Sequence, residues 1–139
     1  MNRKLTDAAI IWQRREEEAM SKFLVHIHTG PSDPTKATLG CLIAATALKE
    51  GHDVTVFMAG DGVHLLADEH LESLVGQGTG ALKDHIAAIA DGGGQFVLSG
   101  MSAKARGYDE RLLDGHPAEF GMPDKLVKLA DEADTVLCY

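Results

Sequence analysis

The chain has 139 residues, and its 13 Lys plus Arg stand against 21 Asp plus Glu, which gives a formal net charge of −8. This length is typical of one domain that buries its own core without disulfides or a structural metal. The negative charge repels nucleic acid and anionic membranes, and no stretch approaches the roughly 20 apolar residues of a membrane span. We therefore expect a soluble protein with neither nucleic acid nor a membrane as its partner.

The cysteines and the loops after the predicted strands exclude further classes of protein. Cys41 and Cys138 lie in apolar segments without CxxC or Cys/His spacing, a pattern typical of reduced, buried thiols in a cytoplasmic protein. Neither a P-loop nor a G-x-G-x-x-G follows the first predicted strand, where residues 29–34 read Thr-Gly-Pro-Ser-Asp-Pro. We expect a cytoplasmic location and neither a cofactor nor a metal.

Residues 1–20 form an extension before the domain, for which we predict the range 21–139. Leu5, Ala8, Ala9 and Trp12 keep helical spacing after Thr6, which predicts a short amphipathic helix over 6–20. Such a helix would dock on the domain or on a neighbouring subunit. The alternative, which the sequence leaves open, is a leader of little consequence before a domain that opens with a strand.

From residue 23 onward, short apolar runs alternate with longer helical patterns. Strands are predicted at 23–28, 53–59, 95–98 and 135–138, and helices at 34–50, 81–90 and 123–133, with a turn and a short helix after Gly60-Asp61-Gly62. Alternating strands and helices predict a three-layer α/β/α sandwich with a mostly parallel sheet.

The helix predicted at 34–50 has clear end signals. Asp33 is placed to cap it, Pro34 suits its first turn, and Gly51 follows as a stop. Residues 39–48 are apolar almost all round, and one face of a sheet cannot cover such a helix completely. The pattern therefore implies a second covering surface, for which another subunit is a candidate.

Parallel strands bring their carboxyl ends to one edge of the sheet, where α/β proteins keep their sites. This edge collects the candidate ligand-binding residues His28, Thr29, Asp61, His64, Ser99, Gly100, Met101, Ser102 and Arg106. Free N–H groups at helix starts, with Lys104 and Arg106 nearby, favour a small anionic ligand. The structural alternative is that these cations form a solvated helix face and that the glycines only make turns.

Other chemistries find less support in the sequence. Ser99 or Ser102 could serve as a nucleophile with His28 or His64 as base and Asp61 as orienting acid, but the G-x-S-x-G elbow is absent. A metal site from His26, His28 and His64 requires a strand face that a helix is expected to cover. We expect neither hydrolysis nor a metal.

Several segments, in order, resemble the DsrE-like sulfur-relay family over about residues 22–138. They are Thr29-Gly30-Pro31 with Pro34, residues 51–57, Gly60-Asp61-Gly62-Val63 and Ala103-Lys104-Ala105-Arg106-Gly107. The resemblance implies a DsrE-like α/β domain that assembles into homo-oligomers, as trimers or hexamers. Some members of this family pass a persulfide sulfur from protein to protein.

The chain departs from the family pattern at the atom that carries sulfur. Active members have cysteine where this chain has Ser99, and Ser102 also lies where cysteines occur in relatives. Sulfur relay needs a thiolate, so we expect a non-catalytic protein that binds a small molecule or assembles with a sulfur-relay partner. The alternatives are a sulfurtransferase that uses Cys41 or Cys138, and a purely structural homo-oligomer.

Overall fold

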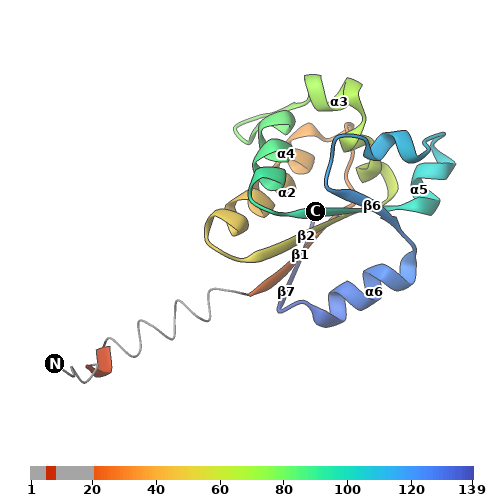
Figure 1. Cartoon of the computed structure of the whole chain (residues 1–139). Helices are drawn as coiled ribbons and strands as arrows, with labels where there is room; N and C mark the ends of the chain where they lie inside the picture. The colour runs from red at the N-terminus through yellow and green to blue at the C-terminus, as the bar shows by residue number, and fades with distance from the viewer. Residues whose placement is uncertain (1–5, 9–20) are drawn as a thin grey trace.

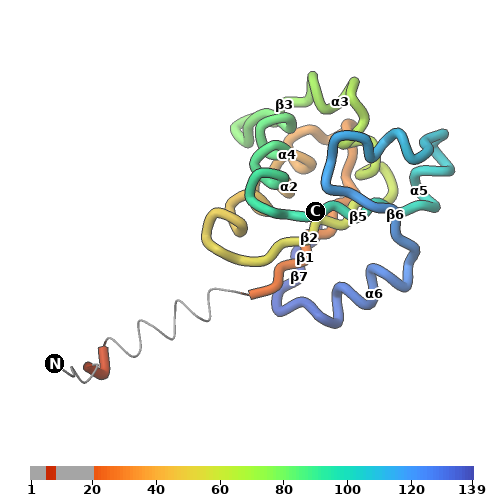
Figure 2. The backbone as a smooth tube through the Cα atoms, in the orientation of Figure 1, coloured from red at the N-terminus to blue at the C-terminus, as the bar shows by residue number. Residues whose placement is uncertain are grey.

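The computed structural model describes residues 6–8 and 21–139, so most of the helix predicted over 6–20 lies outside the described residues. Figures 1 and 2 show the arrangement of the elements. In chain order they are β1 (Lys22–Ile27), α2 (Pro34–Lys49), β2 (Asp53–Met58), η1 (Gly60–Leu66), α3 (Asp68–Ser73), β3 (Val75–Gly76), β4 (Gly80–Ala81), α4 (Leu82–Asp91), β5 (Gln95–Ser99), α5 (Gly100–Ala105), η2 (Glu110–Leu113), β6 (Ala118–Gly121), α6 (Pro123–Glu132) and β7 (Thr135–Cys138).

Five strands form the main sheet in the order β6-β5-β2-β1-β7, and all four pairings are parallel. The short strands β3 and β4 pair antiparallel in a separate hairpin. The predicted α/β class with a parallel sheet is confirmed.

The two faces of the sheet are covered to different extents. Helices α2 and α4 lie over one face, and α6 lies over the other (Figure 1). The deeper core lies on the α2 and α4 side and contains Val25, Ile27, Val56, Phe96 and Leu98, all buried. On the α6 side the buried apolar side chains among the described residues are Leu24, Phe57 and Val97, which pack against one side of the helix.

The sequence patterns placed the main elements within one residue at either end. Thus the first strand is Lys22–Ile27 instead of 23–28, and the fourth is Thr135–Cys138 as predicted. The edge strand β6 and the β3–β4 hairpin were missed. Both are very short, and β6 contains no β-branched residue, so neither produces a periodic pattern.

Helix α2 begins and ends where its capping residues predict. The Asp33 carboxylate accepts a hydrogen bond from the N–H of Lys36 at 3.1 Å, and Pro34 occupies the first turn. Gly51 follows the helix with a φ of +93°, a conformation that strongly favours glycine. Helix α4 of the same chain packs against α2, so part of the predicted second covering surface is internal.

Candidate functional site

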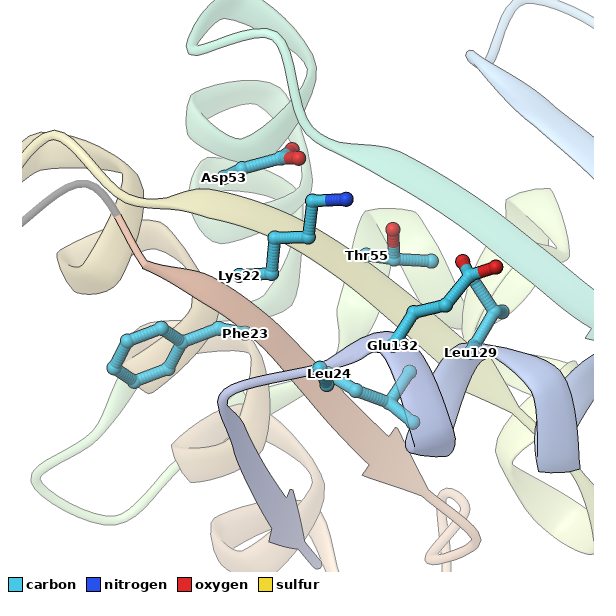
Figure 3. A pocket seen from close by; sticks show the side chains of 8 residues that line it. Lys22, Phe23, Leu24, Asp53, Thr55, Leu129 and Glu132 are labelled. Carbon is cyan, nitrogen blue, oxygen red and sulfur yellow. The ribbon is translucent and has the colours of Figure 1, made fainter.

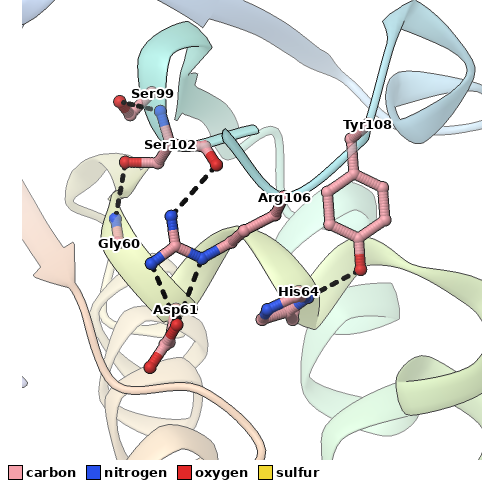
Figure 4. A network of polar contacts seen from close by, with 7 residues as sticks. All are labelled: Gly60, Asp61, His64, Ser99, Ser102, Arg106 and Tyr108. Carbon is pink, nitrogen blue, oxygen red and sulfur yellow. Dashed lines mark hydrogen bonds and ion pairs between the residues drawn. The ribbon is translucent and has the colours of Figure 1, made fainter. Parts of the chain in front are cut away.

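The carboxyl ends of β2 and β5 are joined by hydroxyl groups. Ser99, the last residue of β5, caps α5 because its Oγ accepts a hydrogen bond from the N–H of Ser102 at 3.1 Å. The Oγ of Ser102 in turn accepts a bond from the N–H of Gly60, the first residue of η1, at 2.8 Å (Figure 4). These two serines therefore fix the start of η1 to the start of α5.

An ion pair spans the same two loops. The Oδ1 atom of Asp61 accepts hydrogen bonds from Nε and Nη2 of Arg106 at 3.1 and 3.0 Å (Figure 4). The Nη1 atom of Arg106 donates to the carbonyl oxygen of Ser102 at 3.1 Å. The Arg106 side chain is 28% exposed, and its two bonds to Oδ1 hold Asp61 in one orientation.

The loop after β1 packs closely against Asp61. A Cβ atom added to Gly30 would lie 2.5 Å from the carbonyl oxygen of Asp61 and 2.7 Å from its Cβ. Gly62 is equally restricted, since its added Cβ would lie 2.2 Å from the carbonyl oxygen of Ile27. Glycine at both positions allows the loops after β1 and β2 to touch.

His64 belongs to a group of rings beside this ion pair. Its Nδ1 atom lies 2.6 Å from the hydroxyl of Tyr108, and its ring meets that of His70 edge-on at a centroid distance of 5.7 Å. Burial, His70 and Arg106 lower the pKa of His64. Burial and then Glu69 raise the pKa of Tyr108. Near pH 7 both groups are therefore neutral and joined by a hydrogen bond.

A cavity of about 270 Å³ opens in front of these groups, lined by Pro31, Ser32, Asp61, His64 and His70. Three of its polar lining residues contact neighbouring side chains that fix their orientation. Tyr108 contacts His64, Arg106 holds Asp61, and Glu69 lies 3.4 Å from Nε2 of His70. Such support fixes the direction in which each group is presented to a ligand.

The structure brings most of the predicted site residues together. Asp61, Ser99, Ser102 and Arg106 form one hydrogen-bonded network, with Gly100 directly beside it. His64 is bonded to Tyr108 and lines the same cavity as Asp61. Thr29 lies in the adjoining loop, and Met101 is exposed on α5. His28 does not join the network, because it is exposed and its ring contacts His26.

Four residues at the site were not predicted from the sequence: Pro31, Ser32, His70 and Tyr108. His70 lies on α3, a polar helix with no buried residue, and Tyr108 lies in the loop after α5. The only available signal was the closeness of His70 to His64 in the chain.

The histidines considered for a metal fall into two groups. His26 contacts His28 and Phe57 on the α6 side, whereas His64 contacts His70 and Tyr108. Among the residues that the structure describes, no three His, Cys, Asp or Glu side chains gather to hold a metal ion.

The candidate nucleophiles are engaged or enclosed. The hydroxyls of Ser99 and Ser102 accept hydrogen bonds from backbone N–H groups, and among the described residues no histidine bonds to either hydroxyl. Cys41 is fully buried in α2, and burial raises the pKa of its thiol to about 12. The prediction of a buried thiol is wrong for Cys138, which is exposed on the edge strand β7, with β1 and β2 between it and β5.

Another cavity lies at the opposite end of the strands. It measures about 110 Å³ and is lined by residues including Lys22, Asp53, Thr55 and Glu132, at the amino ends of β1 and β2 beside α6 (Figure 3). It shares no residue with the strand-end site.

No described helix is long and apolar enough to cross a bilayer.

Comparisons with known proteins agree with this architecture. The family model of the DsrE/DsrF-like family matches residues 21–139. The crystal structure of the YchN protein from E. coli is similar with a TM-score of 0.69 and 16% sequence identity, covering 86% of this chain and 100% of that one. No curated protein matches the sequence. The chain belongs to the DsrE/DsrF-like family.

Proposed function

We propose that this protein acts by binding: it holds a small molecule at the strand-end site or assembles with sulfur-relay proteins, and carries no sulfur itself. The position of its thiols is the observation that supports this function. The chain has two cysteines. One is enclosed in α2 and the other lies on a distant edge strand, while serines occupy the positions where the family resemblance sets cysteines.

The chemistry of sulfur relay explains why this position matters. A carrier thiolate attacks the outer sulfur of a donor persulfide, a new S–S bond forms, and the donor leaves as a thiolate. With a pKa of about 12, the thiol of Cys41 stays protonated near pH 7 and has no access to a donor. The hydroxyls of Ser99 and Ser102 instead accept backbone hydrogen bonds that hold two loops together.

The cavity beside His64 is the proposed binding site. It presents two imidazole rings, the Ser32 hydroxyl and the Asp61 carboxylate, which supply donors and acceptors to a small polar molecule. Arg106 donates to Asp61 and to the carbonyl of Ser102, which leaves the Asp61 charge balanced within the site. An anionic ligand in this cavity therefore depends on the N–H groups of the imidazoles.

A rate measurement tests the proposal. The reduced protein is mixed with inorganic polysulfide and followed by intact mass spectrometry, beside Cys41→Ser, Cys138→Ser and N-acetylcysteine as a model thiol. We expect no adduct on Cys41 and an adduct on Cys138 that forms no faster than on the model thiol. Ser99→Cys is the matched positive control, because it places a thiol at the strand-end site. Rapid single-sulfur transfer to the unmodified protein, lost in one Cys→Ser variant, would overturn the proposal.

One observation favours a sulfurtransferase that uses Cys138. This residue is exposed and pairs in register with His26 of β1, so both side chains lie on the same face of the sheet. Burial and His28 lower the pKa of His26, so its ring is neutral near pH 7 and supplies no positive charge to stabilise a thiolate. The polysulfide rates of the wild type and of Cys138→Ser decide this alternative.

We also propose that the protein is a homo-oligomer, a trimer or hexamer. The groove between α2 and α4 supports this assembly, since it has a volume of about 550 Å³ and is lined by Leu42, Ala45, Leu48 and Ala88 among others. Light scattering after size-exclusion chromatography measures the subunit number directly. A stable monomer at micromolar concentration would contradict the assembly.

A further inference from the structure

Two imidazole rings from different elements line the cavity at the strand ends. His64 comes from η1 and His70 from α3, and the two rings meet edge-on at a centroid distance of 5.7 Å. The cavity of about 270 Å³ has room for about nine water molecules at about 30 Å³ each. A small ligand that enters this cavity therefore meets both rings.

His64 can take up a proton without losing its hydrogen bond. Its Nδ1 atom lies 2.6 Å from the Tyr108 hydroxyl, and a hydroxyl can both donate and accept. A neutral phenol is the stronger donor of this pair, so its O–H donates to Nδ1 of the neutral ring and the ring proton is on Nε2. In the imidazolium, Nδ1–H donates to the phenol oxygen instead. Nε2 therefore carries a proton in both forms, and within the described part of the chain no group bonds to it.

The charges around His64 favour an anion once the rings are protonated. The ionisable groups that face His64 from the surrounding elements are Asp61 on η1, Glu69 and His70 on α3, Arg106 at the end of α5, and Tyr108 in the next loop. The strands β2 and β5 end beside η1 without a charged residue, and the loop after β1 contributes Pro31 and Ser32. Asp61 and Arg106 are paired at 3.0 Å, so their charges largely cancel. Protonation of both rings then adds two positive charges, opposed among these groups by Glu69, which is 83% exposed.

We propose that this cavity binds a small, doubly charged oxyanion between His64 and His70, and that the rings take up protons from solvent when it binds. This inference rests on the binding function proposed above and names the class of ligand. The N–H groups of the rings and the Ser32 hydroxyl donate to the oxyanion oxygens. In the empty site, burial, His70 and Arg106 keep the pKa of His64 low. A bound anion stabilises the imidazolium and raises this pKa, so the affinity for the anion increases as the pH falls.

Isothermal titration calorimetry with sulfate tests the proposal. Sulfate keeps both of its charges between about pH 5 and pH 8, the range over which histidine titrates. At constant ionic strength, set with chloride, we expect sulfate to bind about tenfold more tightly at the acid end of this range than at the alkaline end. Titrations in two buffers of different ionisation enthalpy should show net proton uptake on binding. The pKa of His64, followed by NMR, should rise when sulfate is added.

Two histidine variants and a control assign the effect to the cavity. His70→Gln removes a ring from a helix that has no buried residue, so the fold is retained. This variant and His64→Gln should each reduce the pH dependence of sulfate affinity to about threefold, which is half of the effect on a logarithmic scale. His52→Gln is the matched control and should leave the affinity unchanged. His52 lies at the opposite end of the strands, where its Nδ1 accepts a hydrogen bond from the N–H of Ser21 at 3.2 Å.

The outcomes separate this inference from the function on which it rests. No detectable sulfate binding, an affinity that does not change with pH, or an unchanged pH dependence in His70→Gln would each overturn the inference. None of these results would restore sulfur transfer to the chain. Rapid transfer of sulfur from polysulfide to the unmodified protein would instead overturn the proposed function, whatever the sulfate titrations give.

Discussion

The cores on the two faces of the sheet differ in size, and the polar candidate site lies at the edge of the face with the larger core. The face under α2 and α4 has an extensive core. The Asp61–Arg106 pair and the His64–Tyr108 pair lie beyond the carboxyl ends of the strands that form this core. In the part of the chain that the structure describes, the α6 face buries three large side chains and leaves Val136 and Cys138 exposed. A deep core supplies rigid elements that hold polar groups in place, whereas a thin face is suited to contact with another segment.

The largest expected effects test this difference in depth. Phe96 lies in the deep core and Phe57 on the α6 face, and both are buried. Phe96→Ala should lower the free energy of unfolding by about 4 kcal/mol, because the surrounding core cannot collapse into the cavity. Phe57→Ala should lower it by about 3 kcal/mol, since a face closed by one helix relaxes more easily. Urea denaturation of both variants measures the two values, and a larger loss for Phe57→Ala would contradict the comparison.

A glycine substitution tests how tightly the deep face holds its site. In Gly30→Ala the new methyl group must displace Asp61, and we expect a loss of about 2 kcal/mol in the free energy of unfolding. Gly100→Ala is the matched control at the same edge. Its Cβ would make ordinary contacts at 3.8 Å with Met122 and Phe120, so it should change stability by less than about 0.5 kcal/mol.

The sequence predicted the elements and part of the site, for physical reasons visible in particular residues. Runs such as Asp53–Met58 are rich in apolar residues, and Asp33, Pro34 and Gly51 mark the ends of α2. Asp61 and Arg106 could be placed together because parallel topology brings strand ends to one edge. Tyr108 and His70 could not be assigned to the site from the sequence. They lie on a loop and on a polar helix, where no periodic pattern indicates which side chains face inward.

A smaller effect is expected from the hydrogen bond of Tyr108. Tyr108→Phe removes the hydroxyl that lies 2.6 Å from Nδ1 of His64, and it should lower the free energy of unfolding by about 1 kcal/mol. Tyr139→Phe is the control, because Tyr139 packs against the same core and its hydroxyl bonds to none of the described residues. Equal losses in the two variants would show that the Tyr108 hydroxyl contributes nothing specific.

The smallest expected effect is a change in the pKa of His64, for which His26 on the α6 face is the comparison. Burial is the first cause that lowers the pKa of each, followed by His70 and Arg106 for His64 and by His28 for His26. The unfolded chain therefore binds protons more readily than the folded one, so stability is complete above the ordinary histidine pKa and falls as the pH drops below it.

Arg106→Gln separates the two histidines. The substitution removes a positive charge near His64 and frees the Asp61 carboxylate, so the pKa of His64 should rise. The pKa of His26 should not change, because its causes lie in its own burial and in His28. Histidine ring signals followed by NMR between pH 5 and pH 8, about the range over which histidine titrates, measure both values. A parallel rise at His26 would show that the two faces of the sheet are electrostatically coupled, which their separate ring contacts do not predict.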